Sequence, residues 1–179
     1  SSDLALRALF AIALSVITVT VVAVPSVSIS TVAVPASTLL QGSQINVLYI
    51  AKMDVSTDPV TVNSVLFTLS GTYDADDLGF VRVYYNATAP SITGATLVNY
   101  ITASFAAPHT YSLGSINRTI AAGASGYFLI AVDVDNTAND NRTIKINGAT
   151  NPLSFTYSTA PNVTNSQADV GGLQTIQAA

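Results

Sequence analysis

No cysteine and no glutamate occur among the 179 residues of this chain, and histidine occurs once, as His109. Without cysteine the chain has no disulfide, no thiolate metal site and no cysteine nucleophile. A single histidine leaves serine–histidine–aspartate catalysis at most one possible general base. Charged residues make up only 9% of the sequence, where an ordinary soluble domain has about 25%. The net charge of −4 also excludes the basic surface of a nucleic-acid-binding protein.

Serine, threonine and asparagine are abundant where charged residues are missing. We therefore expect a hydrated but nearly uncharged surface built from hydroxyl and amide groups. Such a surface suits a chain that packs against copies of itself.

The first part of the chain is apolar from Leu4 to Val24, with Arg7 as its only charge, and Pro25 ends the run. As a helix these residues would span about 31 Å, close to the hydrocarbon thickness of a bilayer. A secretory signal peptide, a transmembrane anchor and an apolar helix buried among protein neighbours all fit this pattern. Because the chain begins with Ser1 rather than Met, we expect the segment to belong to the mature protein.

Residues 1–24, SSDLALRALFAIALSVITVTVVAV, resemble the mature N-terminus of archaeal type IV pilins and archaellins. The resemblance implies an apolar helix that sits in the membrane before assembly and then bundles with its copies in a filament core. It also implies a β-rich head after the helix. Many bacterial pilins carry a glutamate at the position of Ala5, and here the nearest acid is Asp3.

An all-round apolar helix must be buried on every side, and the rest of this chain is too small to wrap it. Lipid or other subunits must therefore cover it. The expected assembly core comprises the large apolar residues Leu4, Leu6, Leu9, Phe10, Ile12, Leu14, Ile17 and Val21. Asp3 and Arg7 stand four residues apart, so they form a possible charge pair within one helix or between neighbours. Arg7 could instead reach the membrane surface.

Residues 16–24 allow a second interpretation, because they are rich in β-branched side chains that favour strands. In a strand, Ile17, Val19, Val21 and Ala23 would line one face. Such a segment could complete the sheet of a neighbouring subunit by strand donation. The helix is favoured, since Leu4–Leu14 is rich in leucine and alanine.

From Ser26 onward the sequence predicts an antiparallel β-sandwich head, so the chain divides into an N-terminal helix (1–25) and a mainly β head (26–179). Short β-branched or aromatic runs alternate with Gly, Pro, Asn and Asp. The expected strands are Val27–Val34, Gln44–Lys52, Thr61–Ser70, Phe80–Tyr85, Thr96–Ile101, Ser115–Ala121, Gly126–Val134, Thr143–Ile146 and Leu153–Tyr157. The expected inward-facing side chains are Val62, Val65, Phe67, Leu69, Tyr127, Leu129 and Ala131.

Two stretches of the head, TVNSVLFTLSGTYDADDLGFVRVYYN and AAGASGYFLIAVDVDNTA, are similar to immunoglobulin-like modules of secreted surface proteins. The resemblance implies an immunoglobulin-like sandwich that acts as a spacer or adhesive part. It carries no enzymatic expectation.

Four sequons, at Asn86, Asn117, Asn141 and Asn162, make N-linked glycans an expected modification of an exported chain. Surface glycans would offset the shortage of charge by keeping the head hydrated.

The acidic groups Asp74/Asp76/Asp77 and Asp133/Asp135/Asp140 invite a calcium hypothesis, with Asp133 and Asp135 as weak candidates. Their spacing matches no complete calcium loop, and turn formation is the favoured interpretation. We therefore expect no metal and no cofactor other than possible glycans. We expect His109 to lie in a loop, and the sequence contains no nucleophile elbow, so we expect no enzyme.

Together these observations predict a structural subunit of an extracellular, cell-surface filament that serves adhesion or surface attachment. Its partners would be identical subunits in a helical polymer, and the membrane before assembly. The alternatives are a filament joined by strand donation and a monomeric binding module anchored in a membrane.

Overall fold

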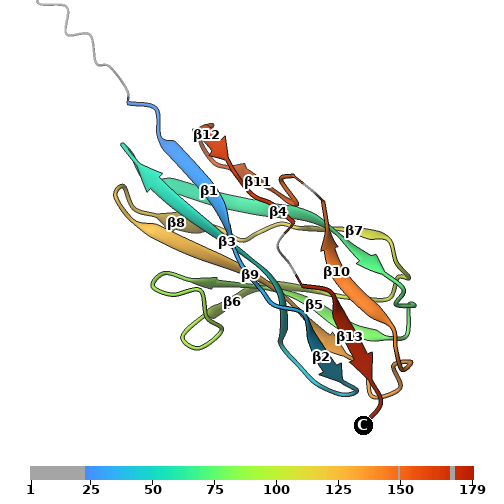
Figure 1. Ribbon diagram of the computed structural model, residues 1–179. Coiled ribbons are helices and arrows are strands. Elements are labelled where there is room, and N and C mark those ends of the chain that lie inside the picture. Colours follow the sequence, from blue (N-terminus) through green and yellow to red (C-terminus); the bar gives the residue numbers. More distant parts are fainter. Residues whose placement is uncertain (1–22, 149, 170–171) are drawn as a thin grey trace, which may run out of the picture.

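The computed structural model describes residues 23–148, 150–169 and 172–179, which form thirteen strands arranged as a two-sheet sandwich (Figure 1). The first sheet has the order β12 (Asn162–Asn165), β1 (Ser26–Val32), β3 (Asn46–Ser56), β9 (Ser125–Val134), β5 (Leu78–Asn86) and β6 (Thr96–Thr102). The second has the order β11 (Leu153–Tyr157), β4 (Val60–Gly71), β10 (Thr143–Asn147), β13 (Gln174–Gln177) and β2 (Ser37–Leu40). Two further strands, β7 (His109–Leu113) and β8 (Arg118–Ile120), pair with β4. The expectation of an all-β sandwich is thus confirmed.

In strand β4, buried apolar side chains and more exposed side chains largely alternate, and the buried ones form part of the core between the sheets. Val62, Val65, Phe67 and Leu69 are each 2% exposed or less, as the sequence predicts. Their polar neighbours point to solvent, because successive side chains of a strand project to opposite faces. Val65 pairs with both Phe155 of β11 and Leu113 of β7. Strand β4 is therefore flanked on both edges.

Strand β9 departs from the expected pattern because it is buried on both faces. Phe128, Ile130 and Val132 belong to the core between the sheets, whereas Leu129 and Ala131 join a second apolar cluster on the outer face of the first sheet. The expectation that Tyr127, Leu129 and Ala131 face inward was therefore wrong. The second cluster is covered by neighbouring segments, whose partly buried members are Val32, Val34, Val47, Ile92 and Ala95.

The sheets are not purely antiparallel, contrary to the sequence-based expectation. Strand β12 pairs with β1 in parallel, and β13 pairs with β2 in parallel. Each parallel pair joins segments that are far apart in the sequence, so a local sequence pattern cannot predict it. The run Ser115–Ala121 contributes only the short β8, because Ser115 and Asn117 have positive φ angles of 55° and 46°. Four strands, β2, β7, β12 and β13, were not expected at all.

In the part of the chain that the structure describes, no helix is long and apolar enough to cross a bilayer. Most of the helix expected over residues 4–24 falls on residues 1–22, outside the described residues, and Ala23 and Val24 are not helical.

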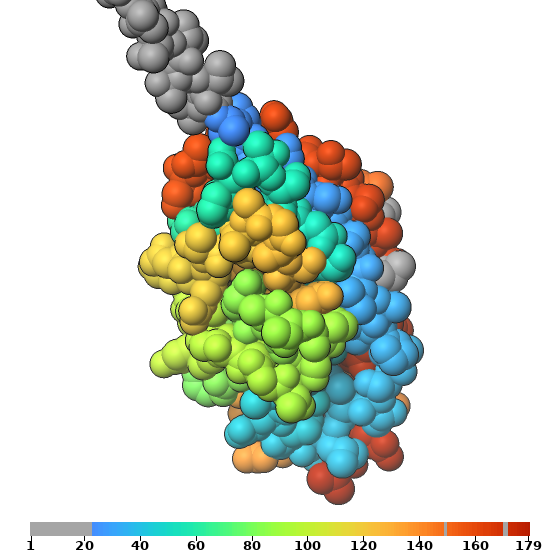
Figure 2. Space-filling model, turned by 90° about the vertical axis from the view of Figure 1, so that its left-hand side faces the viewer, coloured from blue at the N-terminus to red at the C-terminus, as the bar shows by residue number. Residues whose placement is uncertain are grey.

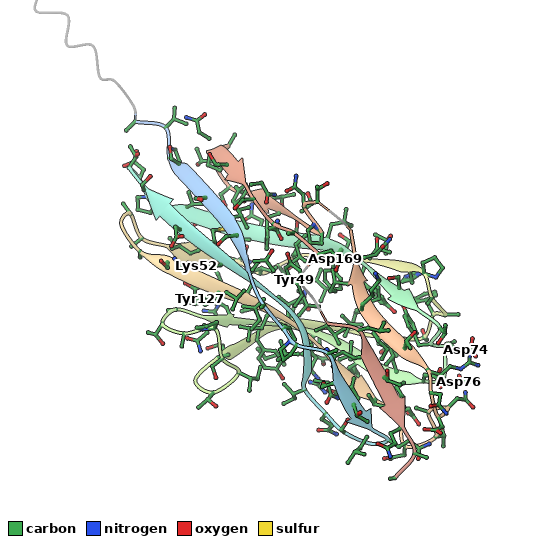
Figure 3. The ribbon with its side chains drawn as sticks, in the orientation of Figure 1. Tyr49, Lys52, Asp74, Asp76, Tyr127 and Asp169 are labelled. Carbon is green, nitrogen blue, oxygen red and sulfur yellow. The ribbon has the colours of Figure 1, made fainter. Side chains whose placement is uncertain are left out.

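A buried carboxylate, Asp77, fixes the loops at the end of the sandwich far from Ser26 (Figure 3, where the neighbouring Asp74 and Asp76 are labelled). It is fully buried and accepts hydrogen bonds from the backbone N–H groups of Asp74 at 2.7 Å and Asn139 at 2.6 Å. The side-chain amide of Asn139 adds a third at 3.0 Å. Since buried polar groups must be paired, Asp77 ties the β4–β5 loop to the β9–β10 loop.

Strand β4 ends at Gly71, where the backbone lies so close to the Thr143 backbone that only glycine fits. Its φ is +134°, and an added Cβ would lie 2.0 Å from the Thr143 carbonyl oxygen. We predict that Gly71→Ala destabilises the protein by about 2 kcal/mol or more, because both the backbone angle and the contact become strained. Gly79→Ala is the matched control, since nothing lies within 4 Å of its added Cβ. Thermal unfolding of the two variants tests this, and equal melting temperatures would contradict it.

Candidate assembly surface

The predicted assembly core and the predicted charge pair lie outside the described residues, within 1–22: Leu4, Leu6, Leu9, Phe10, Ile12, Leu14, Ile17, Val21, Asp3 and Arg7. What the structure does describe is the place where this segment joins the sandwich and the surface around it.

The N-terminal segment joins the sandwich at the edge of the first sheet. The Pro25 carbonyl accepts a hydrogen bond of 2.8 Å from the Asn162 N–H, which holds the start of β1 against the start of β12. Val24, just before, is 50% exposed. The two ends of the described chain lie at opposite ends of the sandwich, with the start of β1 beside β12 and the C-terminus at the far end (Figure 1). Figure 2 shows the same arrangement from the side. Residues 1–22 therefore attach at one end of the molecule.

A groove opens beside this junction, between the edges of the two sheets. It lies between β12 and β1 of the first sheet and β11 of the second, and its lining contains no charged residue. The lining is mostly apolar. Its apolar and aromatic residues are Ile29, Leu153, Phe155, Tyr157 and Val163, and its other polar residues are Asn151, Ser154 and Asn165. We call this feature the β11–β12 groove.

Both strands that border the β11–β12 groove are the last of their sheets in the described structure. On β12, the N–H groups of Asn162 and Ser166 bond to β1, at Pro25 and Ile29, so the backbone of the intervening Val163 points outward. On β11, the Leu153 carbonyl accepts a hydrogen bond from the Gln167 side chain, on the side away from β4. Phe155, two residues on, therefore turns its backbone groups to the same free side.

Tyr157 adds an unsatisfied polar group to this groove. Its hydroxyl is buried and has no hydrogen-bond partner among the described residues. Burial raises the pKa of Tyr157 to about 12. An unpaired buried hydroxyl costs free energy, and the Tyr157 side chain packs against the core between the sheets.

The chain after β12 is fixed to the sandwich by Tyr49 (labelled in Figure 3, with Asp169 close by). The Tyr49 hydroxyl donates to the Ala168 carbonyl at 3.1 Å and also contacts the Thr31 hydroxyl at 2.5 Å. Burial raises the pKa of Tyr49 to about 12, and the Thr31 contact opposes that rise. The far end of the groove is therefore held by contacts within the subunit.

The outer face of the second sheet is lined by paired hydroxyl groups. Thr61 contacts Thr119 at 2.7 Å, and Thr68 contacts Thr110 at 2.8 Å, each across adjacent strands. Cross-strand threonine pairs of this kind stabilise a sheet without charge. This face agrees with the nearly uncharged surface expected from composition.

The four sequons differ in their surroundings. Asn117, Asn141 and Asn162 are exposed, in turns or at the edge of the first sheet. Asn86 is only 3% exposed, and its side-chain amide donates to the carbonyls of Ser91 and Thr93 at 2.8 and 3.1 Å. Its amide nitrogen, where a glycan would be attached, thus anchors the loop that covers the second apolar cluster.

The acidic side chains are used in turns and ion pairs. Asp133 pairs with Arg82 and accepts the Ile45 N–H at 2.9 Å. Asp135 accepts the backbone N–H and hydroxyl of Thr137, and these hydrogen bonds lower its pKa. Among the described residues no group of three or more carboxylate or imidazole side chains could hold a metal ion. The arrangement of Asp133 and Asp135 is that of turn and ion-pair residues.

His109 lies at the start of β7 in an aromatic stack. Its ring is 3.9 Å from that of Phe105, in a nearly parallel orientation, and meets Tyr111 edge-on at 4.6 Å. In the described part of the chain it makes no hydrogen bond with a serine or aspartate. These contacts are packing contacts.

No protein-family model matches this chain, and no curated protein matches it. A solved structure of a complex between CaDoc0917 and CaCohA2 matches 84% of this chain and 99% of its own, with 14% identity. Its TM-score is 0.32, which is too low to support an argument about fold or function.

Residues of the β11–β12 groove could not be found from the sequence. The alternation of Leu153, Phe155 and Tyr157 indicates one apolar strand face. Nothing local places Ile29 and Val163, from the other sheet, opposite that face.

The surroundings of the sequons predict unequal modification. On protein isolated from its native source we expect glycans at Asn117, Asn141 and Asn162, and none at Asn86, because its amide is buried and engaged. Peptide mass spectrometry tests this site by site. In addition, Asn86→Gln should lower the melting temperature and leave the glycan mass unchanged. Asn162→Gln should lower the glycan mass and leave the melting temperature unchanged. A fully occupied Asn86 in folded protein would contradict the assignment.

Proposed function

We propose that this protein is a structural subunit of an extracellular, cell-surface filament that self-assembles through its apolar N-terminal segment. The observation that carries the proposal is the contrast between residues 4–24 and the sandwich. The segment is apolar on all sides, whereas the described sandwich already buries its core between its own two sheets. An apolar segment of this size needs partners, and identical subunits supply one such segment each.

The surface of the sandwich supports packing between copies. Its charges are few, and several are already paired within the subunit, such as Arg82 with Asp133 and Lys52 with Asp54. The second sheet presents hydroxyl pairs in place of charges. Close packing of like subunits then brings little charge repulsion.

The head is, in this proposal, an immunoglobulin-like module of the kind found in secreted surface proteins. Two packed sheets with mainly antiparallel pairing support that assignment. The parallel pairs β1–β12 and β2–β13 distinguish this head from a purely antiparallel sandwich.

The first candidate for the joint between subunits is a central bundle of helices, as the resemblance to archaeal type IV pilins implies. The segment would lie in the membrane before assembly and exchange lipid contacts for close helix packing afterwards. The second candidate is donation of residues 16–24 as a strand. The β11–β12 groove is the specific observation that favours this second joint.

The exposed sequons and the outer faces of the sheets would serve adhesion or surface attachment. Glycans at Asn117, Asn141 and Asn162 would keep a weakly charged head hydrated. The role is non-enzymatic in this proposal, because His109 stacks on aromatic rings.

Substitution in the apolar segment tests the proposal. We expect Leu9→Lys or Phe10→Asp to abolish filament formation, because burying one charge in an apolar environment costs about 3 kcal/mol per subunit. The head should keep its melting temperature, since its core contains no residue of this segment among those described. Electron microscopy and sedimentation measure assembly.

The matched control is Leu40→Lys, the same change at a 53% exposed leucine in β2, an edge strand of the second sheet. This variant should still assemble. Normal filaments from Leu9→Lys would contradict the central helix bundle, because donation of residues 16–24 as a strand does not use Leu9. Equal loss of filaments in both variants would contradict assembly through the N-terminal segment.

A further inference from the structure

The β11–β12 groove has the properties of a strand-acceptor site. It is uncharged and mostly apolar, and it lies between two edge strands whose backbone groups at Phe155 and Val163 point away from their own sheets. Unpaired strand edges bind added strands through backbone hydrogen bonds, while pockets for alternate side chains provide specificity.

The chain contains one segment that complements such a site. Residues 16–24 are uncharged, and Ile17, Val19 and Val21 alternate with Thr18 and Thr20. As a strand, this segment presents a row of β-branched apolar side chains on one face and hydroxyls on the other. The apolar row would lie against Val163, which is 45% exposed, above the side chains of Ile29 and Phe155, which are packed in the core. The hydroxyl row would face solvent.

We propose that the β11–β12 groove receives residues 16–24 of a second copy of this chain as an added edge strand. The inference rests on the proposed filament function. It identifies the site that would receive the strand if subunits are joined by strand donation. Each copy has one donor segment and one groove, so the contact is head-to-tail and repeats without closing, which builds a filament.

The geometry of the junction favours a second copy over the chain's own segment. The Pro25 carbonyl accepts a hydrogen bond from the Asn162 N–H at the start of β12, so the described chain enters β1 at this end of the groove. To lie along β12, the chain's own segment would have to reverse direction within residues 23–25. As an extended strand, residues 16–24 would span about 30 Å, which is more than the length of the five-residue strand β11. A neighbour's segment therefore reaches the whole groove without a reversal.

Cysteine cross-linking tests the assignment, because the native chain has no cysteine. The test variant carries Val19→Cys and Val163→Cys, the latter in a 45% exposed position that lines the groove. Each of two matched control variants keeps one of these cysteines and places the other at a different position. Thr18→Cys with Val163→Cys turns the donor thiol to the other face, and Val19→Cys with Tyr100→Cys moves the acceptor to β6, at the opposite edge of the first sheet.

Under mild oxidation of assembled protein, the test variant should give a reducible ladder of dimers and higher oligomers. Its yield should exceed that of either control by about tenfold, because a disulfide forms only where the Cα atoms come within about 7 Å. Melting temperatures of the unoxidised variants show that all three fold alike.

Filaments in which the test variant gives no ladder, or no more than the controls, would overturn the groove assignment and leave the proposed function standing. A cross-linked monomer alone would overturn it in favour of the chain's own segment. Absence of filaments from the unsubstituted chain would overturn the proposed function, and with it the inference.

Discussion

The need to bury apolar surface is the constraint on which this account depends. The sandwich meets it internally, because Phe67, Phe128 and Phe155 pack with other buried side chains between its two sheets. Residues 4–24 are a further apolar run in the sequence, and an apolar run of this length also has to be buried. The proposed function thus combines a domain that has its own core with a segment that other subunits bury. In the proposed function, self-assembly follows from that combination.

The low charge of the chain has consequences inside the head as well as on its surface. The buried carboxylate of Asp77 accepts three hydrogen bonds, and Asp133 is neutralised by Arg82. The remaining turns use asparagine, serine and threonine, whose hydrogen bonds do not depend on ionisation between neutral and mildly acidic pH. The head should therefore tolerate close packing with its copies, since few exposed charges would have to be brought together.

Much of the fold was predictable from local patterns, and the rest depends on contacts between distant segments. Alternation in β4 correctly located Val62, Val65, Phe67 and Leu69. The same reasoning failed for β9, since a strand covered on both faces shows no single apolar face. The parallel edge strands, and the groove that they create with β11, arise from pairings of segments more than 100 residues apart, such as Ser26 with Asn162. The motif at Asn86 identifies a glycan acceptor, but only the fold shows that its amide holds a loop.

Cryo-electron microscopy of the native material, followed along residues 1–24 of each subunit, tests the central claim most directly. The account predicts filaments in which residues 4–24 are buried against other subunits, either as a central bundle of helices or as a strand in the neighbour's β11–β12 groove. The two arrangements are distinguishable at once from the course of the backbone. Single particles, or filaments joined only by contacts between heads, would contradict assembly through the N-terminal segment.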